Sequence, residues 1–193
     1  MRVIAGLGKG YRLLGPKSTK SRPTEDKIKE SVFNVLYPLR ENSVILDLFS
    51  CTGSIGIEFL SRGSKKVFFS ESNYDNIRIL NENLEKTRFL EQAEVLQGDF
   101  KKNILRVYED IDYVYIDPPY YSDFYTKALH IMKDIVYFRN AYFIFEADKR
   151  IDVLENFNCF ELVFQRRYGK KEISIYKIID LDERKTHESN LSG

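Results

Sequence analysis

The sequence predicts an α/β fold in which helices cover both faces of a mostly parallel sheet. From residue 43 onward, apolar runs of strand length alternate with segments whose apolar residues recur at helical spacing. Strands of a parallel sheet are buried on both faces, so they form continuous apolar runs of this kind. Near the end of the chain the apolar period changes to two, which predicts an antiparallel hairpin. The 193 residues suffice for one domain of ordinary size.

Residues 1–23 are expected to form a small basic arm. Two short runs, RVIA and YRLL, flank a Gly-rich stretch, which predicts a β-hairpin with a tight turn. The arm has no acidic residue and carries six basic ones: Arg2, Lys9, Arg12, Lys17, Lys20 and Arg22. The rest of the chain has 24 basic and 29 acidic residues, so the net charge of +1 conceals an asymmetry. Such an arm suits contact with a polyanion, although a solvated N-terminus would have the same composition.

The main domain is expected over residues 24–181, followed by a polar tail over 182–193. Its first helix would be capped by Thr24, with Glu25 and Asp26 in its first turn, and would be closed by Pro38. Five parallel strands are expected next, at residues 44–49, 67–71, 94–97, 113–117 and 142–146. Alternation at 160–164 and 173–177 adds the two hairpin strands, which makes seven.

Composition excludes several classes of protein. Cys51 and Cys159 are far apart and form no CxxC pair, which argues against a zinc or iron–sulfur site and against a disulfide framework. No apolar run approaches the roughly 20 residues of a membrane span, and none near the N-terminus has the length that a signal peptide needs. We therefore expect a cytoplasmic protein with no bound metal and no membrane contact.

Candidate binding residues stand where the predicted parallel strands end, because ligands of open α/β sheets bind at that edge. After Asp47 a turn with Gly53 and Gly56 leads into a helix, so its backbone N–H groups could approach a nucleotide-like ligand. The three-glycine phosphate fingerprint is absent, and a plain tight turn would look the same. Glu71 could hold a ribose diol and Asp99 an exocyclic amine, but either could equally cap a helix.

The fourth strand end is the most specific. Asp117, Pro118, Pro119 and Tyr120 directly follow an apolar run. Prolines have a fixed φ and no N–H, so the neighbouring carbonyl groups are held rigidly. A carboxylate, fixed carbonyls and an aromatic ring form a receptor for a planar group that bears an NH2.

In this order, DLFSCTG, Glu71, Gly98-Asp99 and DPPY resemble the RsmD family of bacterial 16S ribosomal RNA guanine-N2 methyltransferases. Further matching pieces are RVIAG, RPT at 22–24, KESVFNVL, GIEFLSRG and RRYGKKEISIYK, so the resemblance covers most of residues 1–178. It implies a Rossmann-like class I methyltransferase fold with S-adenosylmethionine as cofactor. It also implies a monomer that acts on ribosomal RNA or on the assembling small subunit.

The resemblance also implies roles for individual residues. Asp117 to Tyr120 would hold the target base, and the basic residues of the arm would bind RNA phosphates. Glu71 would hold the ribose, Asp99 and Phe100 would meet the adenine, and residues 22–24 would close the site. The implied cofactor-binding residues are Thr24, Asp47, Phe49, Gly53, Glu71, Ser72, Asp99 and Phe100.

One residue departs from the family pattern. Where the family usually has glycine, this chain has Cys51. Since a non-glycine residue tolerates positive φ poorly, either the position has ordinary dihedral angles here or cofactor affinity is reduced. A nucleophilic role for Cys51 is disfavoured, because methylation of an amine needs no covalent intermediate and no histidine lies near it in the sequence.

Three other functions compete with this interpretation. DPPY would also fit an adenine-N6 methyltransferase of DNA or RNA, although 193 residues leave little room for a region that recognises a DNA sequence. A nicotinamide-dependent oxidoreductase would lack its GxGxxG fingerprint and leave DPPY unexplained. A non-catalytic RNA-binding protein is disfavoured by the intact motif at 117–120.

Overall fold

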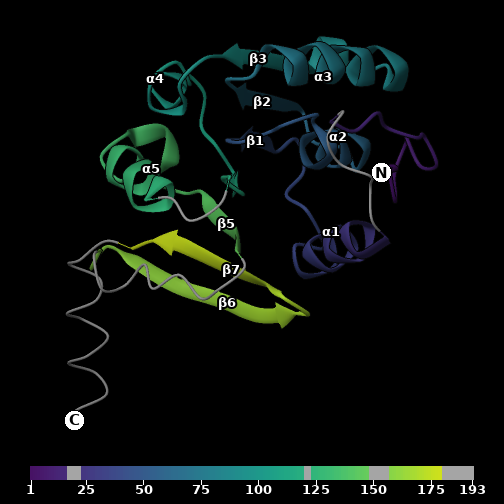
Figure 1. Cartoon of the computed structure of the whole chain (residues 1–193). Coiled ribbons are helices and arrows are strands. Elements are labelled where there is room, and N and C mark those ends of the chain that lie inside the picture. The colour runs from purple at the N-terminus through teal and green to yellow at the C-terminus, as the bar shows by residue number, and fades with distance from the viewer. Residues whose placement is uncertain (17–22, 120–122, 148–156, 180–193) are drawn as a thin grey trace.

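The computed structural model describes residues 1–16, 23–119, 123–147 and 157–179. Within these ranges the chain forms one seven-stranded sheet in the order β3-β2-β1-β4-β5-β7-β6 (Figure 1). Each strand lies close to its predicted position, and the fold class is confirmed. The parallel strands are β1 (Val44–Asp47), β2 (Lys66–Glu71), β3 (Ala93–Gln97), β4 (Tyr113–Ile116) and β5 (Tyr142–Ala147). The antiparallel pair is β6 (Phe160–Tyr168) and β7 (Lys171–Ile178), and β7 also pairs antiparallel with β5.

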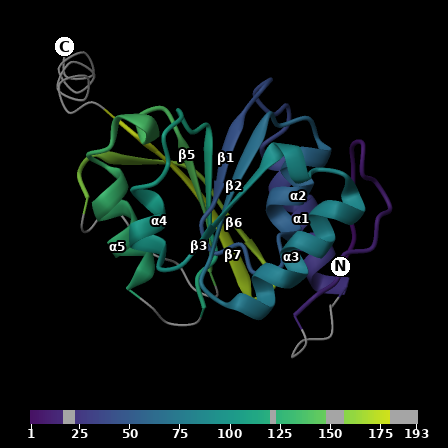
Figure 2. The ribbon, with the colours of Figure 1, turned by 90° about the horizontal axis from the view of Figure 1, so that it is seen from above.

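Helices cover both faces of the sheet. In the view of Figure 2, α1, α2 and α3 lie on one side and α4 and α5 on the other. Two short 3-10 turns, Leu90–Gln92 and Val136–Phe138, complete the described elements. No helix within the described ranges combines the length and apolar character needed to cross a membrane. The helices are α1 (Pro23–Val35), α2 (Ser54–Ser61), α3 (Tyr74–Thr87), α4 (Phe100–Ile104) and α5 (Phe124–Met132).

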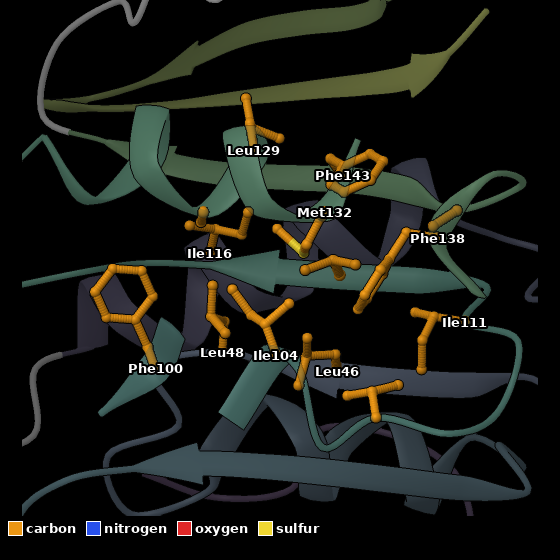
Figure 3. Close-up of a cluster of buried hydrophobic side chains, with 14 of the residues drawn as sticks. Leu46, Leu48, Phe100, Ile104, Ile111, Ile116, Leu129, Met132, Phe138 and Phe143 are labelled. Atoms are coloured by element: carbon orange, nitrogen blue, oxygen red, sulfur yellow. The ribbon is translucent and has the colours of Figure 1, made fainter. Parts of the chain in front are cut away.

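One hydrophobic core lies on each face of the sheet, between the sheet and the helices that cover it. There are two cores because successive side chains of a strand point to opposite faces. On β2, Phe68 lies in the core beneath α4 and α5, and Phe69 lies in the core beneath α1 to α3. Figure 3 shows part of the first of these cores. Neighbouring Ile45 and Leu46 of β1 divide in the same way. Burial on both faces is why these strands form uninterrupted apolar runs in the sequence.

Within the described residues, helix α1 begins two residues earlier than predicted, because a cap at Thr24 would make Glu25 its first helical residue. It starts at Pro23, so Thr24 lies inside the first turn and the predicted cap at Thr24 is wrong. Proline favours the first helical position because its fixed φ suits the helix and its missing N–H would have no partner there. The helix ends at Val35, shortly before Pro38, as expected.

Residues 1–16, here called the N-terminal segment, pack on the α1–α3 side of the domain. The predicted hairpin is present as one antiparallel bridge between Arg2 and Arg12. Beside this bridge the Val3 N–H donates to Tyr11 O, and the Leu13 N–H donates to Met1 O. Val3 and Leu13 are buried in the α1–α3 core. The basic arm inferred from composition is therefore docked over its first 16 residues.

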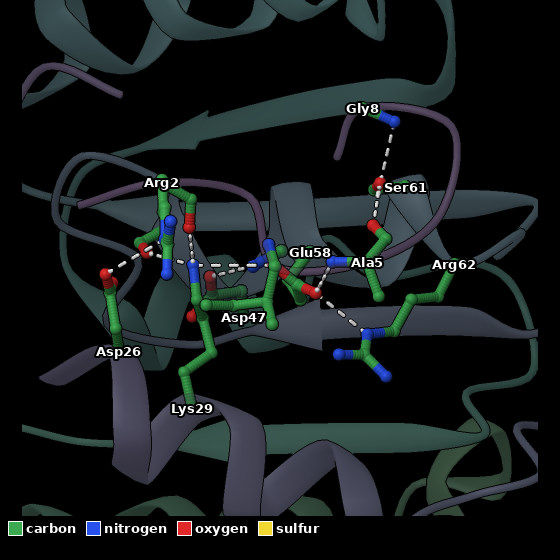
Figure 4. A network of polar contacts seen from close by, with 12 residues as sticks. Arg2, Ala5, Gly8, Asp26, Lys29, Asp47, Glu58, Ser61 and Arg62 are labelled. Atoms are coloured by element: carbon green, nitrogen blue, oxygen red, sulfur yellow. Dashed lines mark hydrogen bonds and ion pairs between the residues drawn. The ribbon is translucent and has the colours of Figure 1, made fainter. Parts of the chain in front are cut away.

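A buried carboxylate fastens this segment to α2. Glu58 is fully buried and accepts from the N–H groups of Ile4 (2.8 Å) and Ala5 (3.0 Å) (Figure 4). It also accepts from Arg62 Nε at 2.8 Å and lies 3.5 Å from Lys29 Nζ. Glu58 thus satisfies two backbone donors and two cationic side chains at once, which a buried charge needs.

Lys29 extends this contact from α1. Its ammonium group donates to Arg2 O at 2.6 Å and to Ser54 Oγ at 3.2 Å. Burial lowers the pKa of Lys29, and the neighbouring Glu58 opposes that change. Through this one side chain, α1 contacts both the N-terminal segment and the first residue of α2.

We predict that Glu58→Ala lowers the free energy of unfolding by about 3–5 kcal/mol, because it leaves Lys29 buried without its counter-charge. Urea denaturation of the full chain measures this loss. Adding Lys29→Met to Glu58→Ala should recover part of it. The matched control is Glu82→Ala, a helical glutamate in an exposed pair with Arg78, which should cost less than about 1 kcal/mol. Equal losses in the two alanine variants would contradict the importance of the buried cluster.

Candidate functional site

The predicted site residues meet at one edge of the sheet. Strands β2, β1 and β4 are parallel neighbours, and Asp47 is in register with Phe69 on one side and Tyr115 on the other. The strand order reverses between β1 and β4, where open α/β sheets bind ligands. The segments that follow β1, β2, β3 and β4 therefore lie around one candidate ligand site at this edge of the sheet.

The turn from β1 to α2 is held by Asp47 and requires its glycines. The Gly56 N–H donates to Asp47 Oδ2 at 3.0 Å, and Asp47 is buried. Gly53 has a φ of 83°, and a Cβ there would lie 2.2 Å from Leu80 Cδ1. A Cβ on Gly56 would lie 2.2 Å from the Phe69 ring. Packing therefore demands both glycines, independently of any ligand.

Asp47 has an unusual charge environment. Burial foremost, and then the Glu71 carboxylate, raise the pKa of Asp47 to about 7, while the hydrogen bond from Gly56 opposes them. A positive charge bound nearby would favour its ionised form.

Cys51 adopts the conformation that glycine favours. Its φ is 49°, so of the two alternatives the one with ordinary dihedral angles is wrong, and reduced cofactor affinity stays a prediction. Burial, with a smaller effect from Glu71, raises the pKa of the Cys51 thiol to about 11. The group is protonated at neutral pH, which agrees with the argument against a nucleophilic role.

Glu71 ends β2 and turns back on the start of α3. Its Oε1 accepts from the N–H groups of Ser72 (2.8 Å) and Asn73 (2.7 Å). Within the described residues, Oε2 accepts only a 3.4 Å bond from Asn76 Nδ2. Neighbouring backbone N–H groups therefore occupy Oε1 of Glu71. The predicted roles of Glu71 and Ser72 in binding a ribose stay predictions.

Asp99 is the N-cap of α4, where its Oδ1 accepts from the Lys101 N–H at 3.0 Å. The alternative cap role is thus realised, and a contact with adenine stays a prediction. Phe100, the next residue, is buried against Phe49 and Phe124, with ring centroids 5.1 and 5.0 Å away. Phe124 was missed by the sequence analysis, although an aromatic residue soon after DPPY is a usable signal.

Two buried amides, also missed from the sequence, fix the loops around the site. Asn83 donates to Leu14 O and Thr52 O, both at 2.9 Å, and accepts from the Leu14 N–H. Asn103 donates to Leu96 O at 2.7 Å and to Ser70 Oγ at 3.0 Å. Asn83 therefore ties the N-terminal segment directly to the β1–α2 turn.

Asp117 lies in a charged cluster at the end of β4. Lys171 Nζ is 3.6 Å from Asp117 Oδ1 and 3.4 Å from Glu146 Oε1. The Tyr115 hydroxyl donates to the second oxygen of Glu146. Desolvation and then the Glu146 charge raise the pKa of Asp117 to about 7, and Lys171 opposes them. Lys171 stands in the motif at 166–177, but no role was predicted for it or for Glu146.

Other predicted site residues have simpler outcomes. Pro118 is buried and Pro119 exposed. In the arm, Lys9 and Arg12 are exposed, and Arg2 forms an exposed ion pair with Asp26 at 3.6 Å. Five predictions lie outside the described residues: those for Lys17, Lys20, Arg22, Tyr120 and the tail at 182–193.

Comparison with known proteins gives this site a context. The family described as Conserved hypothetical protein 95 matches residues 1–177. The chain is 36% identical to Ribosomal RNA small subunit methyltransferase D of Haemophilus influenzae, over 77% of this chain and 79% of that one. It is 29% identical to Putative rRNA methyltransferase YlbH of Bacillus subtilis, over 92% and 98% of the two chains.

A solved structure has the same fold. Putative methyltransferase yhhF from Escherichia coli superposes with a TM-score of 0.75 at 21% identity, covering 92% of this chain and 97% of that one. The family match covers residues 1–177. It therefore includes the strands of the parallel sheet and the charged residues at the ends of β1 and β4. This chain belongs to the Conserved hypothetical protein 95 family, the RsmD-like methyltransferases.

Proposed function

We propose that this chain, a methyltransferase of that family, transfers a methyl group from S-adenosylmethionine to the exocyclic N2 amine of a guanine in small-subunit (16S) ribosomal RNA. The observation that carries the proposal is the placement of Asp117 and Pro118 beside the β1–α2 turn, at the switch point of the sheet. The names of the relatives from Haemophilus influenzae and Bacillus subtilis support ribosomal RNA as the substrate.

The residues at the edge suit S-adenosylmethionine. When bound, it supplies an electrophilic methyl group on a positively charged sulfur. Asp47 is a buried carboxylate whose ionised form such a charge would favour. Glu71 Oε2 is engaged by one 3.4 Å bond within the described residues and could accept from ribose hydroxyls. Phe49 and Phe100 offer an apolar wall for the adenine.

Asp117 and the Pro118 carbonyl are proposed to accept hydrogen bonds from the two N–H groups of the target amine. An exocyclic amine is a poor nucleophile because its lone pair is delocalised into the ring, and these bonds favour the pyramidal form that exposes the lone pair. The Asp117 carboxylate also stabilises the positive charge that develops on nitrogen and can accept the proton that leaves it. The base must leave its stack to reach this position, where Tyr120 would stack on it.

Exposed basic residues of the N-terminal segment, Lys9 and Arg12, are proposed to contact RNA phosphates. In this proposal the chain acts as a monomer in the cytoplasm, on ribosomal RNA or on the assembling small subunit. The receptor at Asp117 would accept the amine of adenine as well as that of guanine. Product identity therefore decides between guanine-N2 and adenine-N6 methylation.

We predict that Glu71→Ala raises the dissociation constant for S-adenosylmethionine by about 5- to 150-fold, the equivalent of 1–3 kcal/mol for hydrogen bonds to a charged group. Titration calorimetry measures this change, with circular dichroism as the check on folding. Glu82→Ala, a glutamate in the middle of α3, is the control and should bind normally. Unchanged affinity in a folded Glu71→Ala variant would remove Glu71 from the cofactor site.

We predict that Asp117→Ala lowers the rate of methyl transfer at least about 100-fold, the usual cost of removing one preorganised electrostatic partner. Asp117→Asn should retain more activity, because its amide oxygen still accepts a hydrogen bond. The assay is single-turnover transfer to small-subunit RNA or particles, followed by mass spectrometry of the nucleosides.

The control for this experiment is Asp134→Ala, an exposed aspartate paired with Lys133, which should leave the rate unchanged. Near-normal turnover of Asp117→Ala would refute the proposed role. A product of N6-methyladenine would preserve the mechanism and overturn the guanine assignment.

A further inference from the structure

Two strands bring charged side chains to the carboxylate of Asp117, which itself follows a third. Asp117 follows β4, Glu146 lies near the end of β5, and Lys171 is the first residue of β7. The antiparallel pairing of β5 with β7 places Glu146 opposite Ile173, two residues from Lys171. The Lys171 ammonium therefore lies between two carboxylates, 3.6 Å from one and 3.4 Å from the other.

Glu146 is fixed more firmly than Lys171. Its side chain is only 13% exposed, against 30% for Lys171, and it accepts from the buried Tyr115 hydroxyl on β4. Tyr125 of α5 donates to the Glu146 carbonyl at 2.7 Å. The Glu146 carboxyl group is thus held in place, and the Lys171 ammonium lies between it and Asp117.

We propose that Lys171 and Glu146 are positioning residues that set the charge and orientation of Asp117, so that the C-terminal hairpin controls the amine-binding carboxylate. This inference rests on the proposed function and deepens it. Neither residue needs to touch the substrate. Their effect on the reaction passes through Asp117, because only its ionised form carries the charge that stabilises the developing positive charge and can take up a proton.

The two neighbours act in opposite directions. A positive charge near a carboxylate favours its ionised form, and a negative charge disfavours it. The pKa of Asp117 is already about 7, so it ionises within the neutral range, where small changes alter its charge most. Among the described residues, Asp47 on β1 also raises the pKa of Asp117. The nearby Tyr115 hydroxyl has a pKa raised well above the ordinary value and is therefore neutral.

The test compares the pH dependence of single-turnover methyl transfer in three variants. Lys171→Met should move the acid midpoint up by about one pH unit, so that activity at neutral pH falls about fivefold and returns at higher pH. Glu146→Gln should move the midpoint down by a similar amount, since Gln keeps the acceptor for Tyr115 without the charge. Lys171→Arg should keep the wild-type midpoint.

The matched control is Lys177→Met, on the same strand and paired with Glu161 at 3.0 Å, which should not move the midpoint. A merely structural role would lower the plateau rate of Lys171→Met and leave its midpoint in place. Midpoints that do not move in opposite directions in Lys171→Met and Glu146→Gln would overturn the inference.

A second measurement does not depend on activity. Carbon-13 NMR of labelled aspartate side chains, with the Asp117 signal assigned by its loss in Asp117→Asn, follows the titration of this carboxyl directly. Opposite displacements of that titration in Lys171→Met and Glu146→Gln would support the coupling, and an unchanged titration would overturn it. If the titration moves but wild-type protein methylates no guanine in ribosomal RNA, the coupling stands and the proposed function fails.

Discussion

The site depends on how β1 passes into α2 at the centre of the sheet. Asp47 fixes the start of α2 by accepting from Gly56, and the Ser50 N–H donates to Ser70 O on the neighbouring strand. From the other side, Asn83 of α3 donates to Thr52 O. A turn held at three points to β2, α2 and α3 has little freedom to rearrange, so a ligand at this edge meets a preformed surface.

The remaining strand ends are placed by the same arrangement. Ser70 accepts from Ser50 through its carbonyl and from Asn103 through its hydroxyl, so the β1–α2 turn, β2 and α4 are linked. Asp117 is positioned by the pairing of β4 with β1. The predicted site residues at these strand ends are therefore placed by the pairing of parallel strands.

The fold could be predicted from the sequence because burial on both faces leaves a direct pattern of apolar runs. The first residue of α1 could not be predicted from the sequence, because Pro23 and Thr24 both suit the start of a helix. The residue at which helical dihedral angles begin is visible only in the structure. Glu71 and Asp99 were found correctly as strand-end carboxylates. Their use as local acceptors of backbone N–H groups depends on side-chain rotamers, which no pattern encodes.

Non-local contacts account for what the sequence did not reveal. Lys171 meets Asp117 only because the hairpin adds β7 next to β5 in one particular register. Asn83 is an ordinary polar residue in an amphipathic helix until Leu14 and Thr52 are brought to it. The basic composition of residues 1–16 was visible, but nothing in the N-terminal sequence indicated that the acidic side chain of Glu58, far along the chain, would accept two of its amides.

That docking has a consequence for the order of assembly during synthesis. The N-terminal segment is translated before its partners Glu58 and Asn83, which lie much further along the chain in α2 and α3. Until then Val3 and Leu13 have no core to enter, and the backbone amides of Ile4 and Ala5 stay hydrated. Residues 1–16 can therefore dock only after residues 54–87 have been made, and the segment must then come back to a surface formed by α2 and α3.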